Sequence, residues 1–148
     1  MKIRELLDTE EFRSRANVMT GPDETVGSAV SKLIEHNIGS LPVCDDNGRP
    51  VGIITERDII RKSYKRETEI AYMRVGDIMS KNLVIATMDD DVDYAINAMK
   101  QEKIRHLPLI DDSRVVGIIS MRDLLGIQLE QANYRIRLLD DYISGGLG

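Results

Sequence analysis

The stretch "VGIITERDII" at residues 51–60 returns as "VGIISMRDLL" at residues 116–125. Six of the ten positions are identical, and Thr55 and Ser120 exchange one hydroxyl side chain for another. Self-similarity at a fixed separation indicates a duplicated structural unit. Duplication for a larger hydrophobic core explains the shared apolar positions, but it leaves the shared hydroxyl and Asp positions unexplained.

The match extends upstream of this stretch. Residues 25–60 align with residues 91–125, and the separation between the copies falls from 66 to 65 residues inside an Asp-rich turn. A surface hairpin tolerates such a change of length. Residues 2–6 pair with residues 74–78 in the same way. We therefore predict repeat 1 at 1–62, a linker at 63–71, repeat 2 at 72–125, a helical extension at 126–143 and a flexible tail at 144–148.

Each copy shows the same order of elements. A short strand (16–20 or 82–86) precedes a segment whose apolar residues recur at helical spacing. Two strands joined by a hairpin turn follow, and a second helix begins after Thr55 and after Ser120. A unit of about 60 residues buries little apolar surface by itself. The sequence therefore predicts an α+β fold in which the order β-α-β-β-α occurs twice and the two copies pack through their sheets.

The composition is that of an ordinary globular protein. The chain has 148 residues, of which 42% are hydrophobic and 30% charged, with a net charge of −5. No apolar run reaches the ~18 residues of a membrane span, and the N-terminus shows no signal peptide. We expect a cytoplasmic protein with no membrane partner. Because phosphate backbones bind basic surfaces, we expect no nucleic-acid partner either.

The sequence shows no motif for metal binding or catalysis. His36, His106 and the single Cys44 lack the spacing of metal ligands. One cysteine forms no internal disulfide and fits a reducing compartment. There is no nucleophile beside a base and no phosphate-binding loop with lysine. We therefore predict that the chain is not an enzyme, has no metal site and requires no cofactor.

Thr55-x-x-Asp58 and Ser120-x-x-Asp123 each lie where a strand passes into a helix. One interpretation is a capping box, in which the hydroxyl and the carboxylate satisfy backbone amides at the helix start. The other interpretation is a ligand site. A helix N-terminus attracts phosphate, and a carboxylate beside it can accept hydrogen bonds from the two hydroxyls of a ribose. Both interpretations remain open at this point.

The segment after the second copy has its own pattern. Its apolar residues are spaced 4, 3, 4, 3 and 4 residues apart, at Leu125, Leu129, Ala132, Ile136, Leu139 and Ile143. This heptad-like seam predicts one long helix. The seam is either a contact in a homodimer, which we favour, or a surface that packs back on the chain's own repeats.

The two copies resemble a known family. "SLPVCDDNGRPVGIITERDII" (40–60) and "HLPLIDDSRVVGIISMRDLL" (106–125) are similar to the core of the CBS domain, and two such domains in tandem resemble a CBS pair, or Bateman module. The resemblance covers about residues 1–125. It implies pseudo-twofold packing of the copies through their sheets, two equivalent clefts that often bind adenine nucleotides or S-adenosylmethionine, and pairing of modules into a homodimer.

The resemblance also assigns roles to particular residues. It implies that Asp58 and Asp123 hold ribose hydroxyls and that Thr55 and Ser120 contact ribose or phosphate. It places Arg57 and Arg122 within reach of phosphate.

The residues before Leu-Pro differ between the copies. In some adenylate-binding relatives basic residues there meet phosphates, and the second copy has Arg105 and His106 where the first has Gly39 and Ser40. We therefore expect two unequal sites. For the apolar slot that adenine needs, the candidates are Val18, Ile38, Val84, Ile85 and Ile104.

These observations predict a regulatory module that binds AMP, ADP, ATP or S-adenosylmethionine and signals to a partner protein through a change of conformation or oligomeric state. No catalytic or transporter domain fits beside the repeats in 148 residues, so we expect a stand-alone module. The alternative is a ligand-free dimerisation scaffold of the same fold, in which Thr55 and Ser120 serve only as caps.

Overall fold

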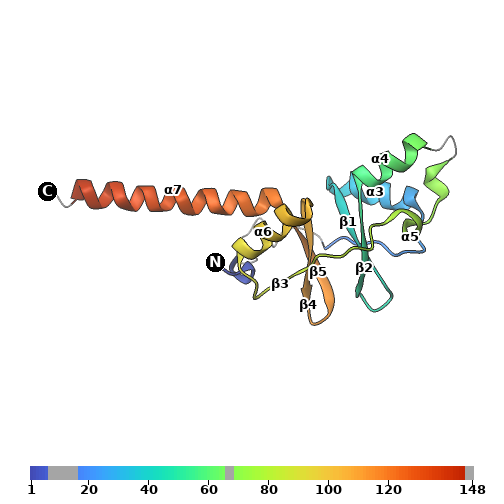
Figure 1. Ribbon diagram of the computed structural model, residues 1–148, viewed down its shortest axis with the longest axis horizontal. Helices are drawn as coiled ribbons and strands as arrows, with labels where there is room; N and C mark the ends of the chain where they lie inside the picture. The colour runs from blue at the N-terminus through green and yellow to red at the C-terminus, as the bar shows by residue number, and fades with distance from the viewer. Residues whose placement is uncertain (7–16, 66–68, 146–148) are drawn as a thin grey trace.

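A computed structural model describes residues 1–6, 17–65 and 69–145 of the chain. Figure 1 shows two small sheets in the middle of the molecule, helices on their outer sides, and one long helix that projects away from the rest. The elements in chain order are α1 (Ile3–Leu6), α3 (Val26–His36), β1 (Ser40–Cys44), β2 (Pro50–Thr55), α4 (Glu56–Lys65), the 3-10 helix η1 (Ile70–Tyr72), α5 (Val75–Ile78), β3 (Ala86–Thr87), α6 (Val92–Glu102), β4 (His106–Asp111), β5 (Arg114–Ser120) and α7 (Met121–Gly145).

The predicted α+β fold with two tandem repeats is confirmed. The first strand of each copy is shorter than expected. Within the described residues of 16–20, only Thr20 makes a strand-like bridge, in parallel with Val43, and β3 comprises two residues that run parallel to β4. These strands are short because each pairs along one side only and contributes few buried side chains.

The two hairpins have the same register. β1 and β2 are antiparallel with Ser40 opposite Thr55, and β4 and β5 are antiparallel with His106 opposite Ser120. Each hairpin has one irregularity just before its turn, at Val43/Cys44 and at Leu109/Ile110. The one-residue difference in length between the copies thus falls in the turn, as the alignment predicts.

Each repeat has its own hydrophobic core. The first-repeat core gathers buried side chains from α3, β1, β2 and α5: Val26, Ala29, Leu33, Leu41, Val43, Ile54, Val75 and Ile78. The second-repeat core gathers Ile3, Leu6, Ala86, Val92, Ala95, Ile96, Met99, Leu107, Leu109, Ile119 and Leu124. Cys44, Ile110 and Val115 form a third, smaller cluster between the repeats, with Met19 packed against it.

The short segment before each repeat packs against the other repeat. Ile3 and Leu6 of α1 are buried in the second-repeat core, whereas Val75 and Ile78 of α5 are buried in the first-repeat core. Backbone bridges hold both segments in equivalent places, Lys2 with Asp91 and Thr25 with Arg74. The predicted repeat 1, which begins at residue 1, is therefore a unit of the sequence only. In the folded chain α1 packs with the second repeat and α5 packs with the first.

α7 is continuous from the end of β5 to Gly145, so the second helix of repeat 2 and the predicted extension at 126–143 are one helix of 25 residues. Its first two turns contact the second repeat through Leu124 and Ile127. Beyond them it extends away from the rest of the molecule (Figure 1). Residues 146–148 of the predicted tail lie outside the described residues. In the part of the chain that the structure describes, no helix is both long and apolar enough to cross a bilayer.

Candidate functional site

The two strand-to-helix turns have the same hydrogen-bond geometry. In the first turn the Thr55 amide donates to Asp58 Oδ2 at 3.1 Å, and the Asp58 amide donates to Thr55 Oγ1 at 3.2 Å. In the second turn the Ser120 amide donates to Asp123 Oδ2 at 3.0 Å, and the Asp123 amide donates to Ser120 Oγ at 3.0 Å. Both turns are therefore capping boxes, with Asp in place of the usual Glu or Gln.

Capping does not exhaust the bonding capacity of Asp58. A carboxylate has two oxygens and about four lone-pair sites. Asp58 uses only Oδ2 in the cap, and among the described residues no group donates to its Oδ1. Thr55 and Asp58 are half-buried, as are Ser120 and Asp123. Each turn therefore places a half-buried hydroxyl and a half-buried carboxylate at a helix start.

The residue two positions before each Leu-Pro pair is hydrogen-bonded to the first residue of a helix, α4 in the first repeat and α7 in the second. The Gly39 carbonyl accepts from the Glu56 amide at 3.0 Å, and the Arg105 carbonyl accepts from the Met121 amide at 2.8 Å. Arg105 and the helical arginines Arg57 and Arg122 are exposed. The structure therefore brings Arg105 and Arg122 to one turn, whereas the first turn has Arg57 and a glycine.

His106 is surrounded by charged groups from both repeats. It lies opposite Ser120 on the paired strand. Burial lowers the pKa of His106, and Arg105 lowers it further, while Asp123 and Glu56 act in the opposite direction. Because Glu56 begins α4 of the first repeat, its carboxylate acts across the boundary between the repeats. The charge around the second turn therefore includes a carboxylate of the first repeat.

Ser40, the counterpart of His106, is almost completely buried, with 1% of its surface exposed. Within the described residues its Oγ has no hydrogen-bond partner, which is uncommon for a buried hydroxyl. It lies opposite Thr55 in the β1–β2 pair. The first turn therefore contains a polar atom whose bonding capacity is unused.

Glu56 is the residue that sequence reasoning missed. A side chain added at Gly39 would lie 3.7 Å from Glu56 Oε2, so this carboxylate covers the backbone at Gly39. The signal was present in the opening repeat, because Glu56 and Met121 occupy the only position there that is neither identical nor a close exchange. The first turn therefore carries an acidic group where the second carries an apolar one.

The apolar candidates for an adenine slot do not gather in one place. Val18 and Ile38 are half-buried against the first-repeat core, and Val84 and Ile104 pack against the second-repeat core. Ile85 precedes β3 and is exposed. The structure thus divides these residues between the two repeats, and core packing accounts for four of the five.

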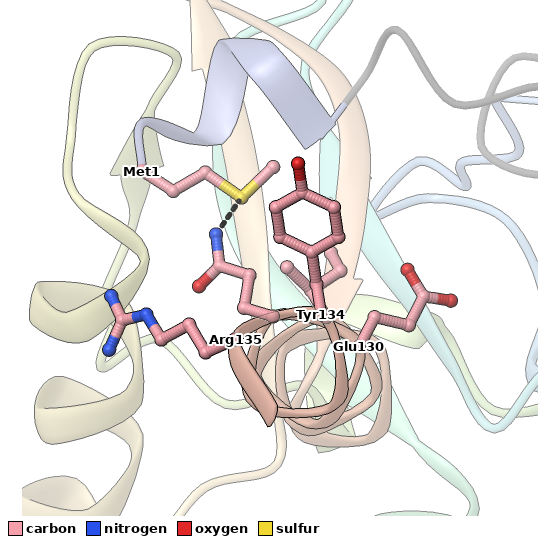
Figure 2. A pocket seen from close by; sticks show the side chains of 6 residues that line it. Met1, Glu130, Tyr134 and Arg135 are labelled. Atoms are coloured by element: carbon pink, nitrogen blue, oxygen red, sulfur yellow. Dashed lines mark hydrogen bonds between the residues drawn. The ribbon is translucent and has the colours of Figure 1, made fainter. Parts of the chain in front are cut away.

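Two hollows lie along α7, away from both turns. The first has a volume of about 360 Å³ and is lined by Met1, Ile127, Glu130, Gln131, Tyr134 and Arg135. Figure 2 shows this hollow between α7 and the N-terminus, where Gln131 Nε2 donates to Met1 Sδ at 3.1 Å. The second is lined by Asp93, Gln128, Gln131, Ala132 and Arg135. Neither includes a predicted ligand-binding residue. The described ranges also contain no cluster of three side chains that could hold a metal ion.

Comparison with known proteins gives a consistent set of relatives. An uncharacterized protein from Methanopyrus kandleri is 35% identical over 117 residues, which are 78% of this chain and 60% of that protein. The chain spans less than two thirds of the length of the curated relatives that it matches first.

Solved structures match over almost their whole length. The crystal structure of the CBS domain NE2398 has a TM-score of 0.77 and 31% identity, covering 87% of this chain and 98% of that one. The CBS domain pair of protein MJ0100, in complex with 5′-methylthioadenosine and S-adenosyl-L-methionine, has a TM-score of 0.74 and 28% identity, covering 88% and 98%.

The two copies seen in the sequence coincide with two matches to one family. The CBS domain matches residues 10–65 and residues 75–130. These segments contain the two hairpins and the two capped turns described above. The chain belongs to the CBS domain family and carries two CBS domains in tandem.

Proposed function

We propose that the chain is a regulatory module that binds an adenosyl ligand at the two strand-to-helix turns. The observation that carries the proposal is the duplication of a hydroxyl and a carboxylate at the start of α4 and of α7, in the same hydrogen-bond geometry. The similarity to a CBS pair that was crystallised with two adenosyl compounds supports the choice of ligand class.

The two turns suit different parts of such a ligand. At each turn the Asp carboxylate would accept hydrogen bonds from ribose hydroxyls. The amide-rich helix start favours negative charge. At the second turn Arg105 and Arg122 supply charge-assisted donors for a phosphate chain. At the first turn the Glu56 carboxylate, which lies over Gly39, disfavours phosphate.

This difference predicts a division of ligands between the turns. Phosphate-bearing compounds such as AMP and ATP should bind mainly at the second turn. Adenosyl thioethers, which carry no phosphate, should tolerate the first. The residues proposed to bind ligand are Thr55, Arg57, Asp58, Arg105, His106, Ser120, Arg122 and Asp123, with Val18, Ile38 and Ile85 as the apolar candidates.

The proposed regulation rests on the closeness of the two repeats at the second turn, where Glu56 of the first repeat influences His106 of the second. A ligand held by residues of both repeats interacts differently with each arrangement of the repeats. It can therefore shift the population of those arrangements, by as much as its affinities for them differ. We propose that a partner protein responds to this shift and that the module itself performs no catalysis.

Calorimetric titration tests the proposal. The wild-type protein is titrated with AMP, ATP, S-adenosylmethionine and 5′-methylthioadenosine, and the titrations are repeated on Asp58→Ala and Asp123→Ala. Loss of a hydrogen bond to a charged group costs about 1.5–3 kcal/mol, so each variant should bind at least about tenfold more weakly at its own turn. Asp123→Ala should affect ATP more than Asp58→Ala does.

A matched control separates ligand binding from helix capping. Thr25 caps α3 by accepting from the Ser28 amide at 3.1 Å, far from the proposed site. Thr25→Ala should lower stability by about 1 kcal/mol, as the loss of a cap does, without changing affinity. If no adenosyl compound gives heat, the ligand-free scaffold is favoured instead. If ligands bind and both Asp variants bind them normally, the site assignment is wrong.

A further inference from the structure

α7 has two different faces. One face contacts the chain's own second repeat through Leu124 and Ile127, and Gln131 on the same face reaches Met1. The other face carries the seam residues Leu125, Leu129, Ala132, Ile136, Leu139 and Ile143, all of which are exposed. Five of these six are large apolar side chains, and an exposed apolar stripe of this length marks an interaction surface.

The repeats leave most of this seam uncovered. Leu124, Ile127 and Gln131 are spaced 3 and 4 residues apart, so they form a stripe of their own that is distinct from the seam. The helix then leaves the second repeat and continues for several turns with its side chains exposed (Figure 1). Apart from Ala132, which lines a hollow with Asp93, the seam does not pack back on the module in the described residues.

The heptad positions identify the kind of partner. With Leu125 at position d, the a positions are Leu129, Ile136 and Ile143, and the d positions are Leu125, Ala132 and Leu139. Two of the three a positions are Ile and two of the three d positions are Leu, a pattern that favours two strands in a parallel coiled coil. The most direct partner with a complementary seam is therefore a second copy of α7.

The flanking charges select the parallel orientation. In a parallel pair the g position of one helix faces the next e position of the other, which places Arg135 opposite Asp140 of the second copy, twice by symmetry. In an antiparallel pair centred on the same seam, Arg135 would face Arg135 of the second copy. The first arrangement joins opposite charges and the second opposes like charges.

We propose that two copies of this chain associate in parallel through the seam of α7, which places both CBS pairs at the same end of a short coiled coil. The association needs no ligand, so this proposal is independent of whether the chain binds an adenosyl compound. Three heptads make a short coiled coil, and the dimer should therefore dissociate on dilution.

The test compares neighbouring leucines that differ in their position on the helix. Leu138 and Leu139 are 50% and 60% exposed, but only Leu139 lies in the seam. Sedimentation of the full chain should give twice the monomer mass of 16.7 kDa. Leu139→Glu should raise the dissociation constant at least about tenfold, and Leu138→Glu should leave it unchanged. Circular dichroism confirms that both variants remain folded. A monomeric wild type, or equal effects of the two variants, would overturn the proposal.

Cysteine cross-linking tests the orientation. A parallel pair places residue 143 of each copy side by side, so Ile143→Cys should form a disulfide-linked dimer on oxidation. An antiparallel pair instead places residue 143 opposite residue 125. In that case Ile143→Cys alone would remain monomeric on a non-reducing gel, and a mixture with Leu125→Cys would cross-link, which would overturn the parallel arrangement. The native Cys44 is buried, and burial together with Asp45 raises its pKa to about 11, so it should not interfere.

Discussion

The two CBS domains share a hairpin register and a capping box, but they differ in the groups placed around them. The first turn has Ser40 and Glu56, and the second has His106 and Met121 at the equivalent positions. The register and the cap depend on local backbone geometry, which both copies keep. The side chains around each turn are free to diverge, so the differences between the copies, and not their common features, should determine which ligand each turn prefers.

The largest effect is expected for substitutions in α1 and α5, the short segments that each pack against the other repeat. Ile3 is fully buried in the second-repeat core, and its counterpart Val75 is fully buried in the first-repeat core. Ile3→Ala should lower the free energy of unfolding by about 2–5 kcal/mol, the usual cost of such a cavity. Val75→Ala should cost somewhat less, because valine is smaller. Urea unfolding measures both.

Arg4→Ala is the control for this experiment. Arg4 lies next to Ile3 in α1 but is exposed, and its ion pair with Asp89 at 3.3 Å lies at the surface. Its removal should change stability by less than about 1 kcal/mol. If Ile3→Ala were as mild as Arg4→Ala, the N-terminal segment would not be part of the second-repeat core.

A second prediction concerns equivalent glycines in the opening repeat. A Cβ at Gly52 would lie 2.6 Å from Met79 Sδ and 2.9 Å from the Ser80 carbonyl oxygen, whereas no described atom lies within 4 Å of a Cβ at Gly117. Overpacking of this kind costs about 1–3 kcal/mol, so Gly52→Ala should be destabilising and Gly117→Ala nearly neutral. Equal changes in the denaturation midpoint would show that the two strands have the same surroundings after all.

A smaller effect distinguishes the turns by pH. The folded-state pKa of His106 is lowered from 6.5, mainly by burial. Between the lowered folded-state pKa and 6.5, the unfolded chain binds more protons at His106 than the folded chain does. The free energy of unfolding should therefore fall as the pH falls through this window. Ser40, the counterpart in the first repeat, does not titrate.

The His106→Gln variant isolates this contribution. Its stability should vary less than that of the wild type between about pH 8 and about pH 5.5, the range in which histidine titrates. Burial alone would raise the pKa of Glu24, but hydrogen bonds from Lys32, Gly21 and Thr20 lower it below 4.5. The contribution of Glu24 to stability is therefore lost only below the pH range in which histidine titrates. Parallel curves for wild type and variant would contradict the assignment to His106.

The sequence was sufficient to predict the features that depend on local pattern. The duplicated hairpins and the strand-to-helix turns at Thr55 and Ser120 follow from residues close together in the chain, and a capping box was one of the two interpretations of these turns. These features are local, so a single sequence contains enough information to predict them. The sequence predicted that the two copies share one core, whereas the structure has a separate core in each repeat.

Other features depend on contacts between distant residues and were not predictable. The exchange of α1 and α5 between the repeats rests on the weak similarity of residues 2–6 and 74–78, which carries no information about which core receives them. The effect of Glu56 on His106 crosses the boundary between the repeats. Gly52 and Gly117 look alike in sequence, and only their surroundings distinguish them.

The most direct test of the proposed function is to follow backbone amide chemical shifts while 5′-methylthioadenosine or ATP is added to the full chain. We predict that the largest shifts occur at the amides of Thr55, Asp58, Ser120 and Asp123, with ATP acting mainly on the second pair. Shifts confined to the hollow beside Met1 and Tyr134, or no shifts with either compound, would contradict the assignment of ligand binding to the duplicated turns.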